Sequence, residues 1–164
     1  MFIPTIYIEN IKSENKSFEI SGNKLHHLKN VLRIRDEDKI NISNGKGLVF
    51  YGKFANNCVK INNSRMYERQ NSLKIFVPYL RERNRFRFLI EKLTELNVNE
   101  IHIGMTENTQ NTNYNKSKIS DWAISALEQS GSAYLPSLFF PDNLNFSIFR
   151  TCLDISGEKL NKNR

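Results

Sequence analysis

The order strand, helix, strand between residues 73 and 105 constrains the fold more than any other feature of the sequence. Residues 73–79 and residues 100–105 are compact apolar segments. Between them, apolar residues recur at helical spacing, so they share one face of a helix. Strands joined by a helix in this way run parallel with a right-handed crossover, which predicts an α/β unit. The apolar face carries Phe86, Leu89, Ile90, Leu93 and Leu96.

A second helix and a third strand are predicted to extend this unit. Apolar residues recur at helical spacing over residues 119–127, and Gly131 follows as the C-cap of the helix. Residues 137–140 are predicted to form a strand and residues 146–152 a short helix. A further strand is expected where the 164 residues end, so the sequence predicts an incomplete sheet.

The first part of the chain has a different pattern, in which short β-type segments follow one another closely. Residues 44–47 supply the positive-φ glycines that a tight hairpin needs. The sequence therefore predicts a small β-barrel over residues 1–70, with the polar residues 62–71 as a linker to the α/β part at 71–164. The predicted strands are residues 2–9, 18–20, 39–43, 48–54 and 58–61.

One helix is predicted within the barrel part, over residues 23–33. Leu25, Leu28 and Leu32 fall on one face of it. This arrangement leaves Lys29 and Arg33 on a separate, exposed face.

Charge and composition favour an anionic partner and a reducing compartment. The formal net charge is +7, and residues 1–70 hold 12 basic against 7 acidic residues. RNA is the commonest polyanion that such a surface attracts, although many basic proteins bind no nucleic acid. Two distant cysteines, no long apolar run and no basic leader predict a cytoplasmic protein with no membrane segment.

The densest basic cluster comes directly after the first strand of the α/β unit. Arg81, Arg83, Arg85 and Arg87 open a helix there, where cations oppose the helix dipole. The cluster is interpreted as a phosphate-binding surface that Lys92 extends, and the alternative is a solvated helix face.

Other chemistry is disfavoured by the motifs. The sequence has no G-x-G-x-x-G and no P-loop. His26 and His27 are adjacent, so they point apart on a helix, and no metal is expected. Glu128 stands near a helix C-terminus against the dipole, which indicates a site, although an ordinary exposed glutamate is the alternative.

Three segments resemble the 16S ribosomal RNA (uracil-N3) methyltransferase family of the SPOUT superfamily. They are residues 26–33, residues 91–101 leading to Thr106-Glu107, and residues 128–131 with Leu135-Pro136 after them. The resemblance implies a PUA-like β-barrel that binds rRNA, followed by an α/β domain that ends in a trefoil knot. In the family this knot holds S-adenosylmethionine, the methyl donor for N3 of a uridine, and the enzyme is a homodimer.

The resemblance and the basic clusters together assign roles to residues, none of them a catalytic base. Those expected to contact 16S rRNA or the small ribosomal subunit are Lys29, Arg33, Arg81, Arg83, Arg85 and Lys92. Those expected to line or support the cleft near the knot are Glu95, Thr106, Glu107, Glu128 and Gln129.

The chain departs from the family pattern in two ways. Asn97 replaces a usual glycine, Asn108 and Ser132 replace usual arginines, and the arginine usual near Pro4 is absent. The family's glycine-rich donor-binding segment does not occur in these 164 residues. We therefore expect a truncated enzyme that lacks the knot, is inactive alone and dimerises weakly if at all. The alternatives are a catalytically dead rRNA-binding protein or a remnant without function.

Overall fold

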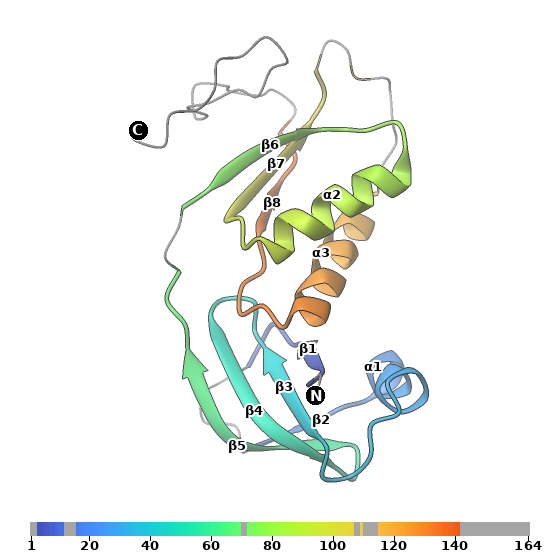
Figure 1. Ribbon diagram of the computed structural model, residues 1–164, viewed down its shortest axis with the longest axis vertical. Coiled ribbons are helices and arrows are strands. Elements are labelled where there is room, and N and C mark those ends of the chain that lie inside the picture. The colour runs from blue at the N-terminus through green and yellow to red at the C-terminus, as the bar shows by residue number, and fades with distance from the viewer. Residues whose placement is uncertain (1–2, 12–15, 70–71, 107–108, 110–114, 142–164) are drawn as a thin grey trace.

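The structure is a computed structural model that describes residues 3–11, 16–69, 72–106, 109 and 115–141. These residues form two units that follow one another along the long axis of the molecule (Figure 1). One unit is a curled five-stranded sheet, and the other is a three-stranded sheet covered by helices. The helix predicted over residues 146–152 lies outside the described residues.

The first unit is a half-barrel in the order β1-β3-β4-β5-β2. Strand β1 runs parallel to β3, and the other neighbours are antiparallel. Within the described residues β1 and β2 are the two edges of the sheet, so the barrel expected from the sequence is curled but not closed. The strands are β1 Thr5–Tyr7, β2 Ser17–Glu19, β3 Lys39–Ser43, β4 Leu48–Ala55 and β5 Cys58–Met66.

The core of the half-barrel follows from the alternation of side chains along its strands. Ile40 and Ile42 of β3 and Phe50 of β4 are fully buried, because alternate residues of a strand face the same side. The Phe18 ring meets the Phe50 ring edge-on, with centroids 5.6 Å apart. Leu28, from the helical segment, completes this core.

The prediction that residues 62–71 form a linker is wrong for the first half of this segment. Strand β5 continues to Met66 and pairs with β4 along this length, with Ser64 opposite Phe50 and Arg65 opposite Val49. The polar side chains in this stretch are exposed. A strand whose side chains face solvent has no apolar alternation, so its sequence resembles a loop.

The helix predicted over residues 23–33 is split in two. Helix α1 covers Gly22–His26, and a π-helical turn, η1, covers His27–Val31. In η1 the Leu32 N–H donates to the His27 carbonyl five residues back, at 3.0 Å. This wider turn rotates Leu32 away from the core, so Leu28 is buried while Leu32 is 39% exposed.

The second unit confirms the parallel α/β arrangement predicted from the sequence. Strands β6 Lys74–Pro78, β7 Glu100–Gly104 and β8 Ser137–Phe139 lie in that order, all parallel. Helix α2 covers Arg83–Glu95 and helix α3 covers Lys116–Ser130. Gly131 ends α3 in the left-handed conformation, as predicted, with φ of 68°.

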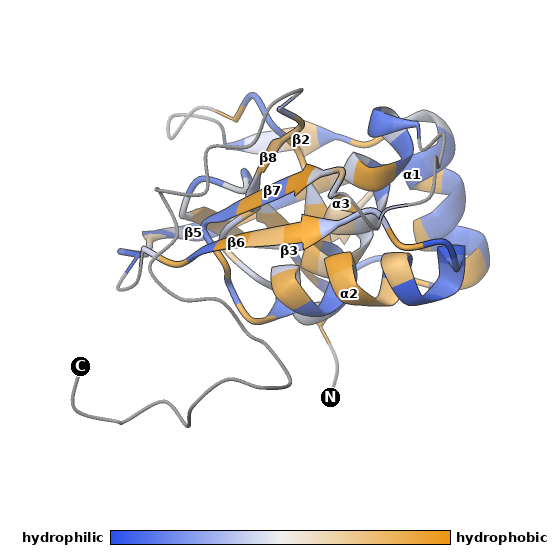
Figure 2. Cartoon of the chain, turned by 90° about the horizontal axis from the view of Figure 1, so that it is seen from above, coloured by the Kyte–Doolittle hydropathy of each residue, from blue (hydrophilic) through white to orange (hydrophobic). Residues whose placement is uncertain are grey.

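Both helices pack on one face of the parallel sheet. Phe86 and Ile90 of α2, Trp122 of α3 and Ile101 of β7 belong to one buried cluster. The Phe86 and Trp122 rings meet edge-on, with centroids 6.1 Å apart. Figure 2 shows β6 and β7 as mainly hydrophobic strands beside α2, whose surface is mixed.

A charged cluster at the start of β7 gives the protein a pH-dependent contribution to stability. Glu100 accepts hydrogen bonds from His102 Nε2 and Lys74 Nζ, both at 3.0 Å, and these bonds hold the pKa of its carboxyl below the usual value. A lowered folded-state pKa stabilises the fold above the pH at which an unfolded glutamate ionises. The contribution disappears as the pH falls through the folded-state pKa.

We expect Glu100→Gln to lower the free energy of unfolding by roughly 0.2–1 kcal/mol near neutral pH, because the pair is half-exposed. The difference from the unaltered chain should vanish as the pH falls well below the pKa of a free glutamate. Urea unfolding across this range measures it. Glu19→Gln in β2 is the control, because no cation of the described residues lies within ion-pair distance of Glu19. Equal effects of the two variants at every pH would contradict the assignment.

Candidate functional site

Lys29, within η1, and Arg33, two residues after its last residue, are both exposed. Arg33 adopts the left-handed conformation, with φ of 54°, and the Ile34 N–H after it donates to the Leu28 carbonyl at 3.0 Å. Among the described residues neither cation has a carboxylate within ion-pair distance. Two unpaired cations beside the exposed Val31 form a surface suited to an RNA backbone.

Most arginines of the cluster at the start of α2 already have interaction partners within the protein. Arg85 Nε lies 2.8 Å from a Glu82 carboxylate oxygen, and Arg87 Nε lies 2.7 Å from one of Glu91. The Arg83 guanidinium stands over the Trp122 ring, 5.8 Å from its centroid. Arg81 is exposed just before the helix. The cluster is thus partly neutralised by its own helix.

Lys92 is also neutralised within α2. Its Nζ lies 2.6 Å from Glu95 Oε2 and also stands over the exposed Phe88 ring. Figure 1 places α2 in the upper unit and α1 in the lower one, so the predicted rRNA contacts fall into two separate groups.

The residues expected to line one cleft lie at opposite edges of the parallel sheet. Thr106 follows β7 at the carboxyl edge, where its Oγ1 lies 2.8 Å from Thr109 Oγ1. Glu95 ends α2, and Glu128 and Gln129 belong to the last turn of α3, both of which run back to the amino edge. Glu107 lies outside the described residues. The structure therefore does not bring Thr106 together with the other three.

Glu128 joins the two units. Its Oε1 accepts a hydrogen bond from the Tyr7 backbone N–H of β1, at 2.8 Å. Lys24 Nζ donates to the Tyr7 carbonyl, so one residue of β1 is held by an acid from α3 and a base from α1. This contact explains why the Glu128 carboxylate stands near the C-terminus of α3, where it opposes the helix dipole. Hydrogen bonds to charged groups are stronger than those between neutral groups.

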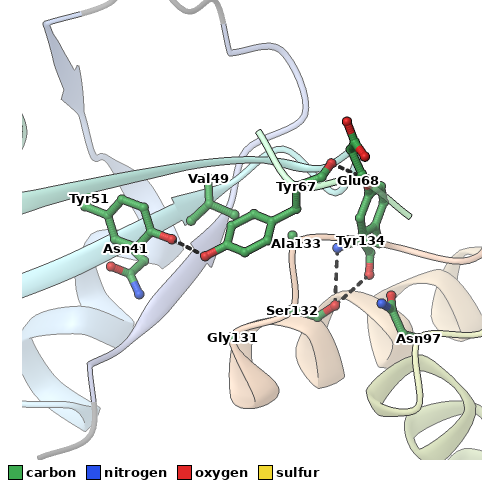
Figure 3. Close-up of a pocket in the computed structure, with 10 residues that line it drawn as sticks. All are labelled: Asn41, Val49, Tyr51, Tyr67, Glu68, Asn97, Gly131, Ser132, Ala133 and Tyr134. Carbon is green, nitrogen blue, oxygen red and sulfur yellow. Dashed lines mark hydrogen bonds between the residues drawn. The ribbon is translucent and has the colours of Figure 1, made fainter. Parts of the chain in front are cut away.

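A pocket of about 440 Å³ lies where the two units meet, and we call it the junction pocket. Figure 3 shows that strands of the half-barrel, the segment after β5 and the segment after α3 all contribute to it. Asn97, which lies two residues after the last residue of α2, also lines the pocket. The lining residues are Asn41, Val49, Tyr51, Tyr67, Glu68, Asn97, Gly131, Ser132, Ala133 and Tyr134.

Tyrosines organise the junction pocket. The hydroxyl groups of Tyr51 and Tyr67 lie 2.6 Å apart, and the Tyr134 hydroxyl donates to the Tyr67 carbonyl (Figure 3). Burial, together with the hydrogen bond to Tyr67, raises the pKa of Tyr51 to about 12. The Tyr51 hydroxyl therefore acts as a neutral hydrogen-bonding group at ordinary pH.

Two departures from the family pattern lie in this pocket. Asn97 has φ of 64°, which explains why a glycine is usual there and why asparagine, which tolerates that conformation, can replace it. Ser132 Oγ exchanges hydrogen bonds with the backbone N–H and carbonyl of Tyr134, both at 3.2 Å. Asn108 lies outside the described residues.

Comparison with known protein families settles the relationship. Residues 68–152, more than half of the chain, match the RNA methyltransferase domain family. The chain belongs to this family. Residues 20–55 also match the RNA methyltransferase PUA domain family, so each of the two units has a family match.

Curated relatives and solved structures agree with the family match. Ribosomal RNA small subunit methyltransferase E of Buchnera aphidicola subsp. Acyrthosiphon pisum is 29% identical over 87% of this chain. A predicted RNA methyltransferase from Thermotoga maritima superposes over 87% of this chain and 67% of its own, with a TM-score of 0.70 and 25% identity.

A third comparison concerns the fold alone. Ribosomal RNA small subunit methyltransferase E of Neisseria gonorrhoeae, solved with bound S-adenosylmethionine, superposes over 87% of this chain with a TM-score of 0.72 and 22% identity. The chain covers 62% of that structure and 61% of the Buchnera relative. This chain thus spans about three fifths of the length of these two relatives.

The described residues contain neither a metal-binding cluster nor a membrane-spanning helix. No three side chains of His, Cys, Asp or Glu lie close enough together there to hold a metal ion. None of the described helices is long and apolar enough to cross a membrane.

Proposed function

We propose that this protein is a small-subunit ribosomal RNA methyltransferase that methylates N3 of a uridine in 16S rRNA, with S-adenosylmethionine as donor. One observation supports the proposal most. A single chain pairs a curled sheet that matches the PUA family of RNA methyltransferases with a parallel α/β unit that matches their catalytic family. Its partner is then the small ribosomal subunit, in the cytoplasm.

The donor's fit to this chain can be tested at the carboxyl edge of the parallel sheet, where α/β folds bind ligands. Met105 and Thr106 stand there after β7, and the Met105 side chain is exposed. Among the described residues the buried side-chain atoms without a partner are Thr5 Oγ1 and Arg69 Nε. Both lie near the opposite edge, so among the described residues no buried side-chain atom at the carboxyl edge lacks a hydrogen-bond partner.

Disruption of the gene for this chain tests the proposed reaction. A methyl group on N3 of uridine blocks base pairing, so reverse transcriptase stops one nucleotide before it. We expect a stop in 16S rRNA that is lost on disruption and returns when the gene is restored. An unchanged set of stops would overturn the proposal, and binding to the subunit without any change in stops would favour an rRNA-binding protein without catalysis.

The unpaired cations of η1 give a prediction about RNA binding. Each phosphate contact contributes about 0.7–0.9 to the slope of log affinity against log salt. We expect Lys29→Ala with Arg33→Asn to reduce this slope by about 1.5 on a small-subunit rRNA fragment, in a filter-binding salt titration. Asparagine is chosen because position 33 has a positive φ.

The control for that titration changes the net charge equally. Lys53 and Lys74 each pair with a carboxylate, at 2.9 Å and 3.0 Å. The variant Lys53→Ala with Lys74→Ala loses the same two charges but no unpaired cation. If its slope falls as much as that of the η1 variant, overall charge explains the binding and η1 has no special role.

A further inference from the structure

We propose that the junction pocket binds one nucleotide of single-stranded RNA, with its base and ribose inside the pocket. The proposal goes beyond methyl transfer, because the pocket lies at the amino edge of the parallel sheet. Of its lining residues, Gly131 directly follows the last residue of α3, and Asn97 lies two residues after the last residue of α2. The donor and the reacting base of an α/β enzyme bind at the other edge.

The hydrogen-bonding groups of the pocket match the edge of a nucleobase. Asn41 and Asn97 line it, and neither side-chain amide bonds to another described residue. A carboxamide presents one acceptor and two donors, and this pairing of groups complements the polar edges of the bases. The pocket volume, about 440 Å³, is within the usual range for small-ligand sites.

Aromatic rings and arginines lie around these amides. The Arg65 guanidinium stands 4.8 Å from the centroid of the Tyr67 ring, and that of Arg69 stands 4.7 Å from the centroid of the Tyr134 ring. Single-stranded RNA is bound by this combination, in which bases stack on aromatic and guanidinium planes and the cations attract the phosphates.

Arg69 is held in place on the side of Tyr134. Its Nη2 donates to the Val98 carbonyl at 3.1 Å, and its Nε is buried without a partner among the described residues. Burial lowers the pKa of this guanidinium. An anion beside Arg69 would supply the acceptor that the buried N–H lacks.

Glu68 restricts the kind of ligand. Its carboxylate lines the pocket and only accepts hydrogen bonds, so a bare phosphate is disfavoured there. A ribose hydroxyl or a base N–H donates to such a group. The 2′-hydroxyl is the donor that distinguishes RNA from DNA. A neutral sugar would also bind to aromatic rings and hydrogen-bond acceptors, but it has no phosphate to interact with Arg65 and Arg69.

Nuclear magnetic resonance titration of residues 1–164 tests the proposal. The probes are each of the four ribonucleoside 5′-monophosphates, a pentaribonucleotide containing the preferred base, its deoxy counterpart, inorganic phosphate and a neutral trisaccharide. We expect saturable shifts of the amides of Asn97 and of residues 131–134 with nucleotides, the RNA pentamer binding most tightly and its deoxy counterpart more weakly.

Asn97→Gly is the variant of choice, because glycine keeps the positive φ while the amide is removed. Loss of one hydrogen bond should weaken nucleotide binding about three- to tenfold. Asn57→Gly is the matched control, since Asn57 has φ of 63° and lies in the turn between β4 and β5. It should change the affinity less than about twofold.

Four outcomes would overturn the proposal. They are no saturable shift with any nucleotide at millimolar concentration, equal affinity for a mononucleotide and the pentamer, tighter binding of the trisaccharide, and equal weakening by Asn97→Gly and Asn57→Gly. Equal affinity would assign the pocket to a free nucleotide, and tighter trisaccharide binding would assign it to a sugar. None of these results depends on whether 16S rRNA is methylated.

Discussion

Replacing Phe86 with alanine is expected to lower the free energy of unfolding by about 3–5 kcal/mol. Phe86 is fully buried between the Trp122 ring and the parallel sheet. Its truncation removes the apolar transfer free energy of the ring and leaves a cavity that the packed helices fill only in part. Small domains are stable by about 5–15 kcal/mol, so this loss brings the second unit close to unfolding.

Phe88 provides the matched control for this variant. It lies two residues later in the same helix but is 60% exposed, with Lys92 Nζ 5.5 Å from the centroid of its ring. Phe88→Ala should cost less than about 1 kcal/mol, mostly the exposed cation–π contact. Urea unfolding followed by the fluorescence of Trp122, the single tryptophan, measures both variants. Equal losses would contradict the packing of α2 described above.

The parts of the fold that the sequence predicts well are those in which burial produces a periodic pattern. The stripe that includes Phe86 and Ile90 has helical spacing because one face of α2 is buried. Strand β7 reads as an apolar segment because all of its residues but the first are buried in the parallel sheet, and in β6 beside it Val77 is buried. In these elements the local pattern and the tertiary environment agree.

The errors occur where exposure or unusual backbone geometry removes that pattern. Residues 62–66 lie in β5 because their backbone pairs with β4, but the side chains face solvent and read as a loop. The π-helical turn η1 displaces Leu32 from the face that a regular helix would give it. Main-chain hydrogen bonds determine the local structure in both segments, and the hydropathy of the side chains gives no sign of these bonds.

The junction pocket was not predicted, since its parts are far apart in the sequence. Asn41, Tyr67, Asn97 and Tyr134 come from four segments that only the contact between the two units brings together. One signal existed: Asn97 stands where the family has glycine, which indicates a backbone requirement but not a site. The roles assigned to Lys29, Arg33 and the arginines of α2 remain predictions.

Replacing Gly47 with alanine is expected to lower the free energy of unfolding by about 2–5 kcal/mol and to disrupt the junction pocket. Gly47 has φ of 101°, which L-residues rarely adopt. A Cβ there would lie 2.7 Å from the Tyr134 hydroxyl oxygen and 2.9 Å from the Tyr67 carbonyl oxygen. The Gly47 N–H also donates to the Ala133 carbonyl at 2.9 Å, so a shift of its backbone breaks a contact between the units.

Gly22→Ala separates the two causes of this loss. Gly22 also has a positive φ, of 59°, but a Cβ there meets nothing within 4 Å. Gly22→Ala should therefore lower the free energy of unfolding only by the cost of the strained backbone, about 1–2 kcal/mol, and leave nucleotide binding unchanged. The difference between the two variants in urea unfolding then measures how tightly Tyr67 and Tyr134 pack against the hairpin. If Gly47→Ala and Gly22→Ala were equally stable, Tyr134 would be free to move, and the pocket would not be the fixed site that nucleotide binding requires.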